Sequence, residues 1–348
     1  MIGFESIIGQ DRPIRILTTF LQNGTVPHAL LFTGIEGVGK QSAAVAFAMA
    51  CNCTGNISEN ITKREYNRAA DEHGNANRRR IMIPCGSCRS CRKIESKNHP
   101  DIIWIKPSGV FIRIDQIRTL CRTLAMKPYE AGMRVVLISD AQAMNPAAGN
   151  ALLKVLEEPP TGTILILLAN HTGELLPTIV SRCRQIRFNP ISKRQMETVL
   201  VRKHGLDPEN AMIIASMAGG SFSQALHMDS TNWINRRNWL ISELDSLSTK
   251  NINRLLAFGE QLAQNKADLP DALEVMKSWL RDLVIEKFYP EKIIHRDLAE
   301  SAHQTAQKMS TTSLLSKIEA IQSTQNTIQA GTNLRLAMET MVLKLSRI

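Results

Sequence analysis

The sequence predicts a parallel α/β domain built around a phosphate-binding loop, followed by a tail that is entirely helical. Three observations support this fold class. A glycine-rich turn lies between an apolar run and an alanine-rich segment near the N-terminus. Apolar runs of strand length then alternate with helical patterns as far as about residue 190, which is typical of a parallel sheet. Strand-like runs disappear from Ser192 onward, so we expect a sheet domain at 1–190 and only helices after it.

The composition indicates a globular chain of two or three domains. The chain has 348 residues, of which 43% are hydrophobic, and a formal net charge of +10. No apolar run approaches the roughly 20 residues that cross a membrane, and residues 1–5 do not open a signal peptide. We therefore expect a cytoplasmic protein with no membrane partner. The positive charge is compatible with a nucleic-acid partner and equally with ordinary solubility.

A phosphate-binding loop is predicted at residues 31–42, with the sequence LFTGIEGVGKQS. A helix over 12–22 and a strand over 28–32 precede it, and a helix over 41–50 follows it. Glycines in such a loop let several backbone N–H groups converge on an anion, and Lys40 can reach the β- and γ-phosphates of a nucleotide. The glycines are Gly34, Gly37 and Gly39.

The residue after the loop lysine departs from the nucleotide-binding motif. The motif G-x-x-x-x-G-K-[ST] places a magnesium-binding hydroxyl there, but this chain has Gln41. Ser42 comes one position late, and one step along a helix turns a side chain by about 100°. The loop therefore has the glycines and the lysine of a nucleotide-binding loop but lacks the magnesium-binding hydroxyl.

Four further strands and two helices complete the predicted sheet domain. Asn145 is expected to cap a helix that begins with Pro146 and is stopped by Pro159 and Pro160. Between the loop helix and the next strand, residues 54–80 are polar and are interpreted as a solvated insertion, with the basic run Arg78–Arg80 as a flexible loop. The strands are predicted at 101–105, 135–138, 163–168 and 185–188, and the helices at 114–125 and 146–156.

Three clustered cysteines predict a structural zinc site. Cys85, Cys88 and Cys91 have two C-x-x-C spacings that share a residue, so three thiolates can converge. A closed tetrahedral zinc site needs a fourth ligand. Cys53 and Cys51 are both candidates, and we favour Cys53, at the end of the loop helix. The remaining cysteines, Cys121 and Cys183, are expected to be buried apolar thiols.

The strand at 135–138 is followed by Ser139 and Asp140. An ATPase needs an acidic pair after a buried strand, one acid to hold magnesium and one to activate the attacking water. Asp140 is then either a cap at the strand end or the remnant of a hydrolytic site that has lost an acid.

The tail is interpreted as helices only. Residues 192–230 give short helices that end at Gly219–Ser221, and a separate helical domain follows Trp233. Such a domain can provide an oligomerisation surface. Its apolar residues fall in four groups, at 255–258, 273–283, 314–321 and 334–345.

The order of the motifs resembles that of bacterial clamp-loader subunits of DNA polymerase III, a family of the AAA+ class. The glycine loop, the cysteine cluster, Asn98–Asp101, Asn150–Pro160 and Ser181–Cys183 follow one another over about residues 1–230, and Asn333–Glu339 lies near the end. The resemblance implies three parts. They are an AAA+ domain at 1–190 with an inserted zinc module at about 53–91, a small helical lid domain at 191–230, and a helical collar at 231–348.

Within this family the chain is similar to delta-prime subunits rather than to the motor subunits called gamma or tau. A motor keeps Thr or Ser after the loop lysine, an Asp-Glu pair after the third strand, and an arginine in a motif of the small domain. This chain has Gln41, Ser139-Asp140 and Ser223 at those positions. The resemblance implies a subunit that does not hydrolyse ATP, while weak nucleotide binding by Lys40 and the glycines stays open.

The resemblance also implies a role for Arg182. In this family the Ser-Arg-Cys arginine enters the ATP site of the neighbouring motor subunit; the alternative is a structural arginine that pairs with a carboxylate. The implied partners are motor subunits and a delta subunit in a hetero-oligomeric ring, with the sliding clamp and primed DNA bound through the assembly. Two other functions stay open: an ATP-hydrolysing motor or other AAA+ enzyme, and a zinc-containing nucleic-acid binder.

Overall fold

The computed structural model describes residues 3–55, 83–247, 251–266 and 268–347. Its contacts divide the chain into two compact units. The first comprises residues 1–196 and 220–223, and the second comprises residues 197–219 and 224–348. The predicted basic run Arg78–Arg80 lies outside the described residues.

The first unit contains a five-stranded parallel sheet in the order β2-β3-β4-β1-β5. Every residue of β1, β3 and β4 is buried, as expected for strands covered on both faces. In the middle of the sheet Leu31 pairs with Leu167 on one side and with Gln185 on the other. The strands are β1 (Ala29–Thr33), β2 (Ile102–Ile105), β3 (Arg134–Ile138), β4 (Thr163–Ala169) and β5 (Arg184–Arg187).

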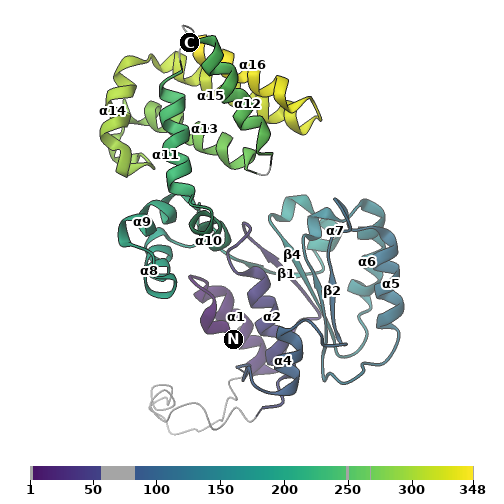
Figure 1. Cartoon of the computed structure of the whole chain (residues 1–348). Helices are drawn as coiled ribbons and strands as arrows, with labels where there is room; N and C mark the ends of the chain where they lie inside the picture. The colour runs from purple at the N-terminus through teal and green to yellow at the C-terminus, as the bar shows by residue number, and fades with distance from the viewer. Residues whose placement is uncertain (1–2, 56–82, 248–250, 267, 348) are drawn as a thin grey trace. The chain divides into compact units, whose positions relative to one another are not determined.

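Helices cover both faces of this sheet (Figure 1). Two apolar cores result, one on each face, and Phe32 and Leu31 point into opposite ones because successive strand residues alternate. One face carries α1 (Asp11–Asn23), α2 (Lys40–Asn52) and α4 (Arg89–Glu95), and the other carries α5 (Ile114–Leu124), α6 (Pro146–Glu157) and the short α7 (Pro177–Val180). Short 3-10 turns lie at Phe4–Ser6, Ala141–Ala143 and Thr172–Glu174.

Local signals explain where these helices begin and end. The Asn145 side chain accepts a hydrogen bond from the Ala148 N–H at 2.8 Å, Pro146 is the first residue of α6, and the helix ends before Pro159. Helix α1 ends at Gly24, which adopts the left-handed conformation.

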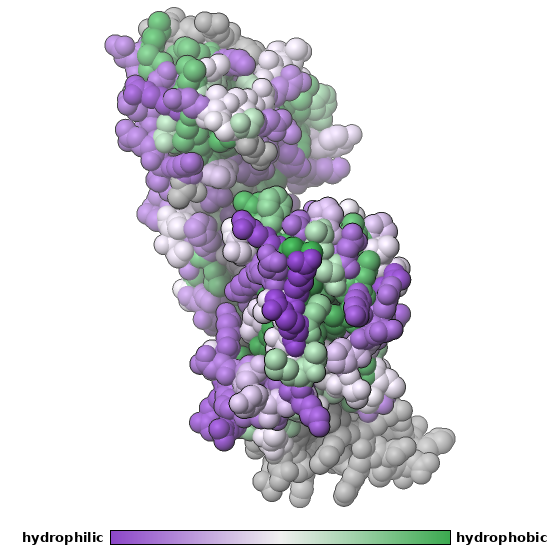
Figure 2. Space-filling model, turned by 90° about the vertical axis from the view of Figure 1, so that its right-hand side faces the viewer, coloured by the Kyte–Doolittle hydropathy of each residue, from purple (hydrophilic) through white to green (hydrophobic). Residues whose placement is uncertain are grey.

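Figure 2 shows the side of the molecule on which α5 and α6 lie, where hydrophilic residues alternate with smaller apolar areas. The amphipathic α5 has three exposed charged residues, Asp115, Arg118 and Arg122.

These elements confirm the predicted fold class, a parallel α/β sheet with a glycine loop after its first strand, followed by helices. All five predicted strands are present, with ends that differ by one residue at most. The pattern did not predict α4 or α7, because both helices are shorter than two full turns and carry little periodicity.

The second unit consists of helices throughout its described part. Helix α13 lies at its centre and packs against α11, α12, α14 and α15, while α12 packs along α16. Trp279 and Met276 of α13 are fully buried. No helix in the described ranges is both long and apolar enough to cross a membrane. The helices of the tail are α8 (Lys193–His204), α9 (Pro208–Met217), α10 (Phe222–Ser230), α11 (Trp233–Asp245), α12 (Ile252–Gln264), α13 (Leu269–Glu286), α14 (Ala299–Lys308), α15 (Thr311–Gln329) and α16 (Leu334–Arg347), with 3-10 turns at Pro290–Lys292 and Arg296–Leu298.

Candidate functional site

The glycine loop connects the end of β1 to the start of α2, and its glycines are required by space and by backbone conformation. Gly34, Gly37 and Gly39 all have positive φ, at 146°, 77° and 99°. A Cβ atom on Gly34 would lie 2.4 Å from the carbonyl oxygen of Phe188, and one on Gly37 would lie 2.2 Å from the Ser221 hydroxyl. The loop is therefore wedged between β5 and the segment at 220–223, and only glycine fits.

Lys40 is buried and folds back onto the loop. Its Nζ donates hydrogen bonds to the carbonyl oxygens of Gly34 and Ile35, the second at 3.0 Å, and to Oδ1 of Asn170 at 3.3 Å. Burial lowers the pKa of Lys40, against the opposing effect of three carboxylates. These are Glu36, Asp140 and Glu174.

A cleft of about 430 Å³ opens beside this loop within the first unit. Its apolar lining includes Ile7, Ile8 and Phe222, and its polar lining includes Lys40 and Asn170. The positions at which the sequence departs from a motor subunit, far apart along the chain, all line this one cleft. They are Gln41, Ser139, Asp140 and Ser223.

These four side chains do not have the chemistry of a hydrolytic magnesium site. Gln41 and Asp140 are exposed, and Asp140 has a left-handed backbone with φ 51°. The Ser139 hydroxyl is buried and has no hydrogen-bond partner within the described residues. Only Asp140 provides a carboxylate at the end of β3, whereas a hydrolytic site uses two acids there.

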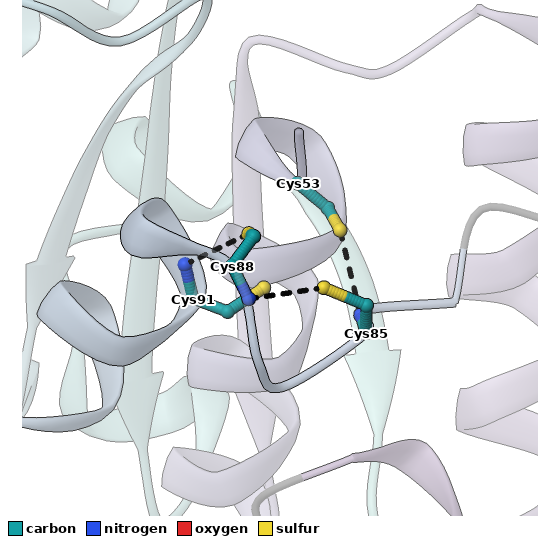
Figure 3. A group of neighbouring side chains, drawn as sticks. All are labelled: Cys53, Cys85, Cys88 and Cys91. Carbon is teal, nitrogen blue, oxygen red and sulfur yellow. Dashed lines mark hydrogen bonds between the residues drawn. The ribbon is translucent and has the colours of Figure 1, made fainter. Parts of the chain in front are cut away.

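Four cysteines converge on the α2 and α4 side of the sheet (Figure 3). The sulfur atoms of Cys53, Cys85, Cys88 and Cys91 all lie within 4.8 Å of one another. Four thiolates around zinc, at Zn–S distances near 2.3 Å, stand roughly 3.8 Å apart. Small side-chain rotations would therefore form a closed tetrahedral shell, and the donor set suits a structural metal ion.

Backbone N–H groups already point at three of these sulfurs. The amide of Cys85 donates to Cys53 Sγ at 3.4 Å, that of Cys88 to Cys85 Sγ at 3.3 Å, and that of Cys91 to Cys88 Sγ at 3.4 Å. Burial raises the pKa of Cys88, but the hydrogen bonds it accepts, led by that from Cys91, outweigh burial and lower it to about 5. Such bonds favour the thiolate, which is the form that binds metal.

Cys51 does not belong to this group. It lies inside α2, and burial raises the pKa of its thiol to about 12. Cys53 follows the helix in an extended conformation, which turns its sulfur toward Cys85. Cys183 is buried and Cys121 is half-buried, and burial raises the pKa of both thiols.

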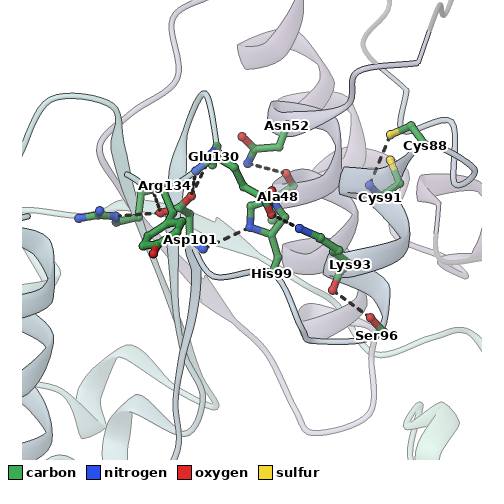
Figure 4. Close-up of polar contacts among 12 residues, drawn as sticks. Ala48, Asn52, Cys88, Cys91, Lys93, Ser96, His99, Asp101, Glu130 and Arg134 are labelled. Atoms are coloured by element: carbon green, nitrogen blue, oxygen red, sulfur yellow. Dashed lines mark hydrogen bonds and ion pairs between the residues drawn. The ribbon is translucent and has the colours of Figure 1, made fainter. Parts of the chain in front are cut away.

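The motif Asn98–Asp101 anchors the cysteine module to the sheet (Figure 4). His99 is buried and its Nδ1 accepts the Asp101 N–H at 3.2 Å. The Asp101 carboxylate accepts three backbone N–H groups at 2.8–2.9 Å and lies 3.8 Å from Arg134 Nε. The three donors are Tyr129, Glu130 and Ala131.

Arg182 lies at the opposite end of the parallel strands from the loop. It precedes β5, whereas the loop follows β1, and the two strands are parallel neighbours. Its Nη2 is 2.6 Å from Oε1 of Glu157, and its Nη1 donates to the Thr178 carbonyl oxygen at 3.0 Å. Arg182 is not among the residues that line the cleft of its own chain.

Sequence patterns alone did not identify Asn170, Ile7, Ile8 or Phe222 as parts of the cleft. Asn170 could have been found, because it is the first polar residue after a buried strand beside β1. The other three come from segments whose approach to the loop depends on the tertiary fold.

Comparison with known proteins identifies similar chains. The family model described as DNA polymerase III, delta subunit matches residues 9–77 and 56–192, and the one described as DNA polymerase III, delta subunit, C terminal matches residues 231–347. The DNA polymerase III subunit delta' of Bacillus subtilis (strain 168) is 27% identical over 341 residues, which cover 97% of this chain and 96% of that protein.

Two further relatives match different shares of the chain. The subunit delta' of Pseudomonas aeruginosa is 34% identical over 160 residues, covering 45% of this chain and 42% of that protein. The subunit tau of Bacillus subtilis (strain 168) is 26% identical over 367 residues, and the match covers 98% of this chain but only 61% of that longer protein.

Proposed function

The chain belongs to the DNA polymerase III delta-subunit family, and from that premise we propose that it is a clamp-loader subunit of the delta-prime type that does not hydrolyse ATP. It joins motor subunits and a delta subunit in a cytoplasmic hetero-oligomeric ring that places the sliding clamp on primed DNA. Residues 191–230 act as the lid domain, and residues 231–348 act as the collar that holds the ring together.

The convergence of the motif departures in one cleft carries this proposal. Gln41, Ser139 and Ser223 come from the loop helix, the end of β3 and the segment at 220–223, yet they line the same cavity. A hydrolytic site needs the groups that these positions normally carry in one place. Their joint replacement within this cleft supports the absence of hydrolysis here.

Arg182 is proposed to act on the ATP of a neighbouring motor subunit. Its position at the end of the strands away from the loop supports action in trans. Its side chain is 37% exposed, so it can reach a second chain. A guanidinium there would stabilise negative charge that develops on the γ-phosphate. The ion pair with Glu157 would hold the side chain in place before assembly.

The four cysteines are proposed to hold a structural zinc ion. Their donor set and mutual distances fit that ion, and bound zinc would tie the end of α2 to the start of α4. Two of the four are C-x-x-C partners of Cys88, and Cys53 closes the site from the other side of the insertion.

ATP turnover by the purified full-length chain tests the absence of hydrolysis. We expect none above the level of a Lys40→Ala variant, which serves as the matched control. Co-elution with gamma/tau-like and delta subunits on size-exclusion chromatography tests the assembly. Turnover that depends on Lys40 would instead favour the second candidate function, a motor subunit, which the similarity to tau subunits keeps open.

A further inference from the structure

One lysine outside every motif also lines the nucleotide cleft. Lys97 lies just after α4, the helix of the cysteine module, and it lines the cleft together with Ile94 and Glu95 from the same helix. The helix that carries Cys91, one of the candidate metal ligands, is thus also one wall of the cleft. This relationship is invisible in the sequence, where 57 positions, from 40 to 97, separate the two lysines.

The backbone of Lys97 is unusual for its residue type. The Lys97 N–H donates to the Ile94 carbonyl at 3.0 Å and the Asn98 N–H donates to the Lys93 carbonyl at 2.8 Å, which is the Schellman pattern of a helix end. The residue in the middle of that pattern has φ 60°, a conformation that glycine or asparagine adopts most easily. A lysine there costs about 1 kcal/mol relative to glycine, and such strain often accompanies a functional role.

Charge in the cleft points to what that role is. Lys40 and Lys97 line it together with three residues that carry carboxylates. The carboxylates belong to Glu36, Glu95 and Asp140. Lys97 offsets one of these three negative charges. Without it Lys40 alone, itself held by loop carbonyls, would face all three, and the repulsion of a polyanion would be stronger.

The Lys97 side chain lies beside the Trp104 ring of β2, and a buried hydroxyl lies in the cleft wall. Its Nζ lies 5.4 Å from the centre of the Trp104 ring, and Lys106 Nζ lies 5.9 Å from the same centre. The Ser139 hydroxyl is buried in the cleft wall and has no hydrogen-bond partner among the described residues. It can therefore donate a hydrogen bond to an anion bound in the cleft.

We propose that Lys97 is the second cationic contact for a nucleoside polyphosphate in this cleft, beside Lys40, and that the cysteine module holds it there. In this chain a lysine next to the cysteine module would then supply part of the positive charge that a magnesium ion would otherwise bring, since the groups that bind magnesium are missing. The inference rests on the part of the proposed function that treats the glycine loop as a nucleotide-binding loop. It requires neither the trans action of Arg182 nor the absence of hydrolysis.

The test is nucleotide binding by the full-length, zinc-loaded chain, measured by calorimetry with ADP and with ATPγS. Lys97→Asn removes the charge and keeps a residue that tolerates the left-handed backbone. We expect it to weaken binding about tenfold, the size of one charge-assisted contact, without lowering the melting temperature. Lys97→Arg should keep the wild-type affinity. Lys106→Asn is the matched control, because it removes a lysine beside the same tryptophan that does not line the cleft.

Metal removal gives a second arm. Chelation should weaken ADP binding in the wild-type chain and change little in Lys97→Asn, since the contact that the module supports is already absent. The proposal is overturned if wild-type chain binds neither nucleotide at millimolar concentration, or if Lys97→Asn binds as tightly as wild type. If chelation unfolds the chain, as seen by circular dichroism, the Lys97 variants alone decide. Co-elution with partner subunits is unaffected by any of these outcomes, so the proposed function fails or survives separately.

Discussion

Arg182 forms an ion pair with Glu157, with Nη2 of the arginine 2.6 Å from Oε1 of the glutamate. Glu157 is the last residue of α6, so the pair joins the end of that helix to the turn before β5. Both side chains are partly exposed, at 37% and 49%, and ion pairs in such surroundings contribute at most about 1 kcal/mol. A more highly charged anion on a neighbouring subunit would therefore displace Glu157 from the guanidinium with little loss of free energy.

Replacing Arg182 should impair the assembled clamp loader and leave the isolated chain stable. We expect Arg182→Ala to lower DNA-stimulated ATP turnover about tenfold, which is less than the roughly 10³–10⁵ of single-site NTPases because the ring has several sites. Glu157→Gln is the control: it breaks the same pair but keeps the arginine, so turnover should persist. Unchanged turnover and clamp loading in Arg182→Ala would show that the arginine is only structural.

Removing one thiolate should release the metal. Cys88→Ser leaves three of the four sulfurs, and we expect its zinc content after dialysis to drop and its melting temperature to fall. Cys121→Ser, a half-buried cysteine outside the cluster, should retain full metal content. Zinc analysis by mass spectrometry measures both. Zinc retained in Cys88→Ser would rule out the four-thiolate site.

Acid should release the metal in the wild-type chain as well. Protons compete with the metal for each thiolate, so affinity should fall as the pH is lowered from neutral. A colorimetric chelator present during an acid titration measures the release. A chain that binds zinc equally at neutral and acid pH would contradict thiolate ligation.

A comparison of Gly37→Ala with Gly24→Ala separates two contributions to the loss of stability, steric contact and backbone strain. Gly37 has φ 77° and its added Cβ would lie 2.2 Å from the Ser221 hydroxyl, so we expect a loss of about 2–3 kcal/mol in the free energy of unfolding. Gly24→Ala keeps positive φ but meets nothing within 4 Å, and should lose only about 1 kcal/mol. Gly173→Ala has neither problem and should be neutral. Equal effects of the first two variants, measured by urea unfolding, would mean that segment 220–223 yields without cost.

Asp101→Asn should destabilise the first unit and flatten its acid denaturation. Burial by itself raises the pKa of Asp101, but three backbone N–H groups and Arg134 outweigh burial, so the pKa lies below its ordinary value of 3.8. A carboxyl with a lowered folded-state pKa contributes stability above its unfolded pKa and loses it as pH falls through the folded value. We therefore expect a loss of about 3 kcal/mol at neutral pH, shrinking below about pH 4. An equal loss at pH 7 and pH 3, from urea unfolding, would contradict this.

The sheet could be predicted from the sequence because its strands are buried on both faces. Runs such as 135–138 and 163–168 are continuously apolar, and each is bounded by polar residues. Strand order was beyond reach, since nothing local in 163–168 specifies that β4 pairs with β1 rather than with β5. Helix α4 was missed because it is less than two turns long, between a cysteine cap and the left-handed Lys97.

The candidate site was predictable residue by residue, but not as a set. The spacing of Cys85, Cys88 and Cys91 predicted three thiolates, whereas the choice of Cys53 over Cys51 depends on where α2 ends. The departures Gln41, Ser139 and Ser223 could each be found by motif. That they share one cleft follows from the return of segment 220–223 to the loop, where the Phe222 N–H donates to the Gly37 carbonyl at 3.0 Å.

Arg182 and the glycine loop lie at opposite ends of the parallel strands, so the two faces that the subunit can offer to neighbours are different. An assembly that joins such faces is heterologous: one face of a chain meets the other face of the next chain. With the roles proposed above for Arg182 and the loop, the chain would complete an ATP site for the neighbour on one side only. We therefore predict that it occupies one end of a row of motor subunits, where the series of active sites stops.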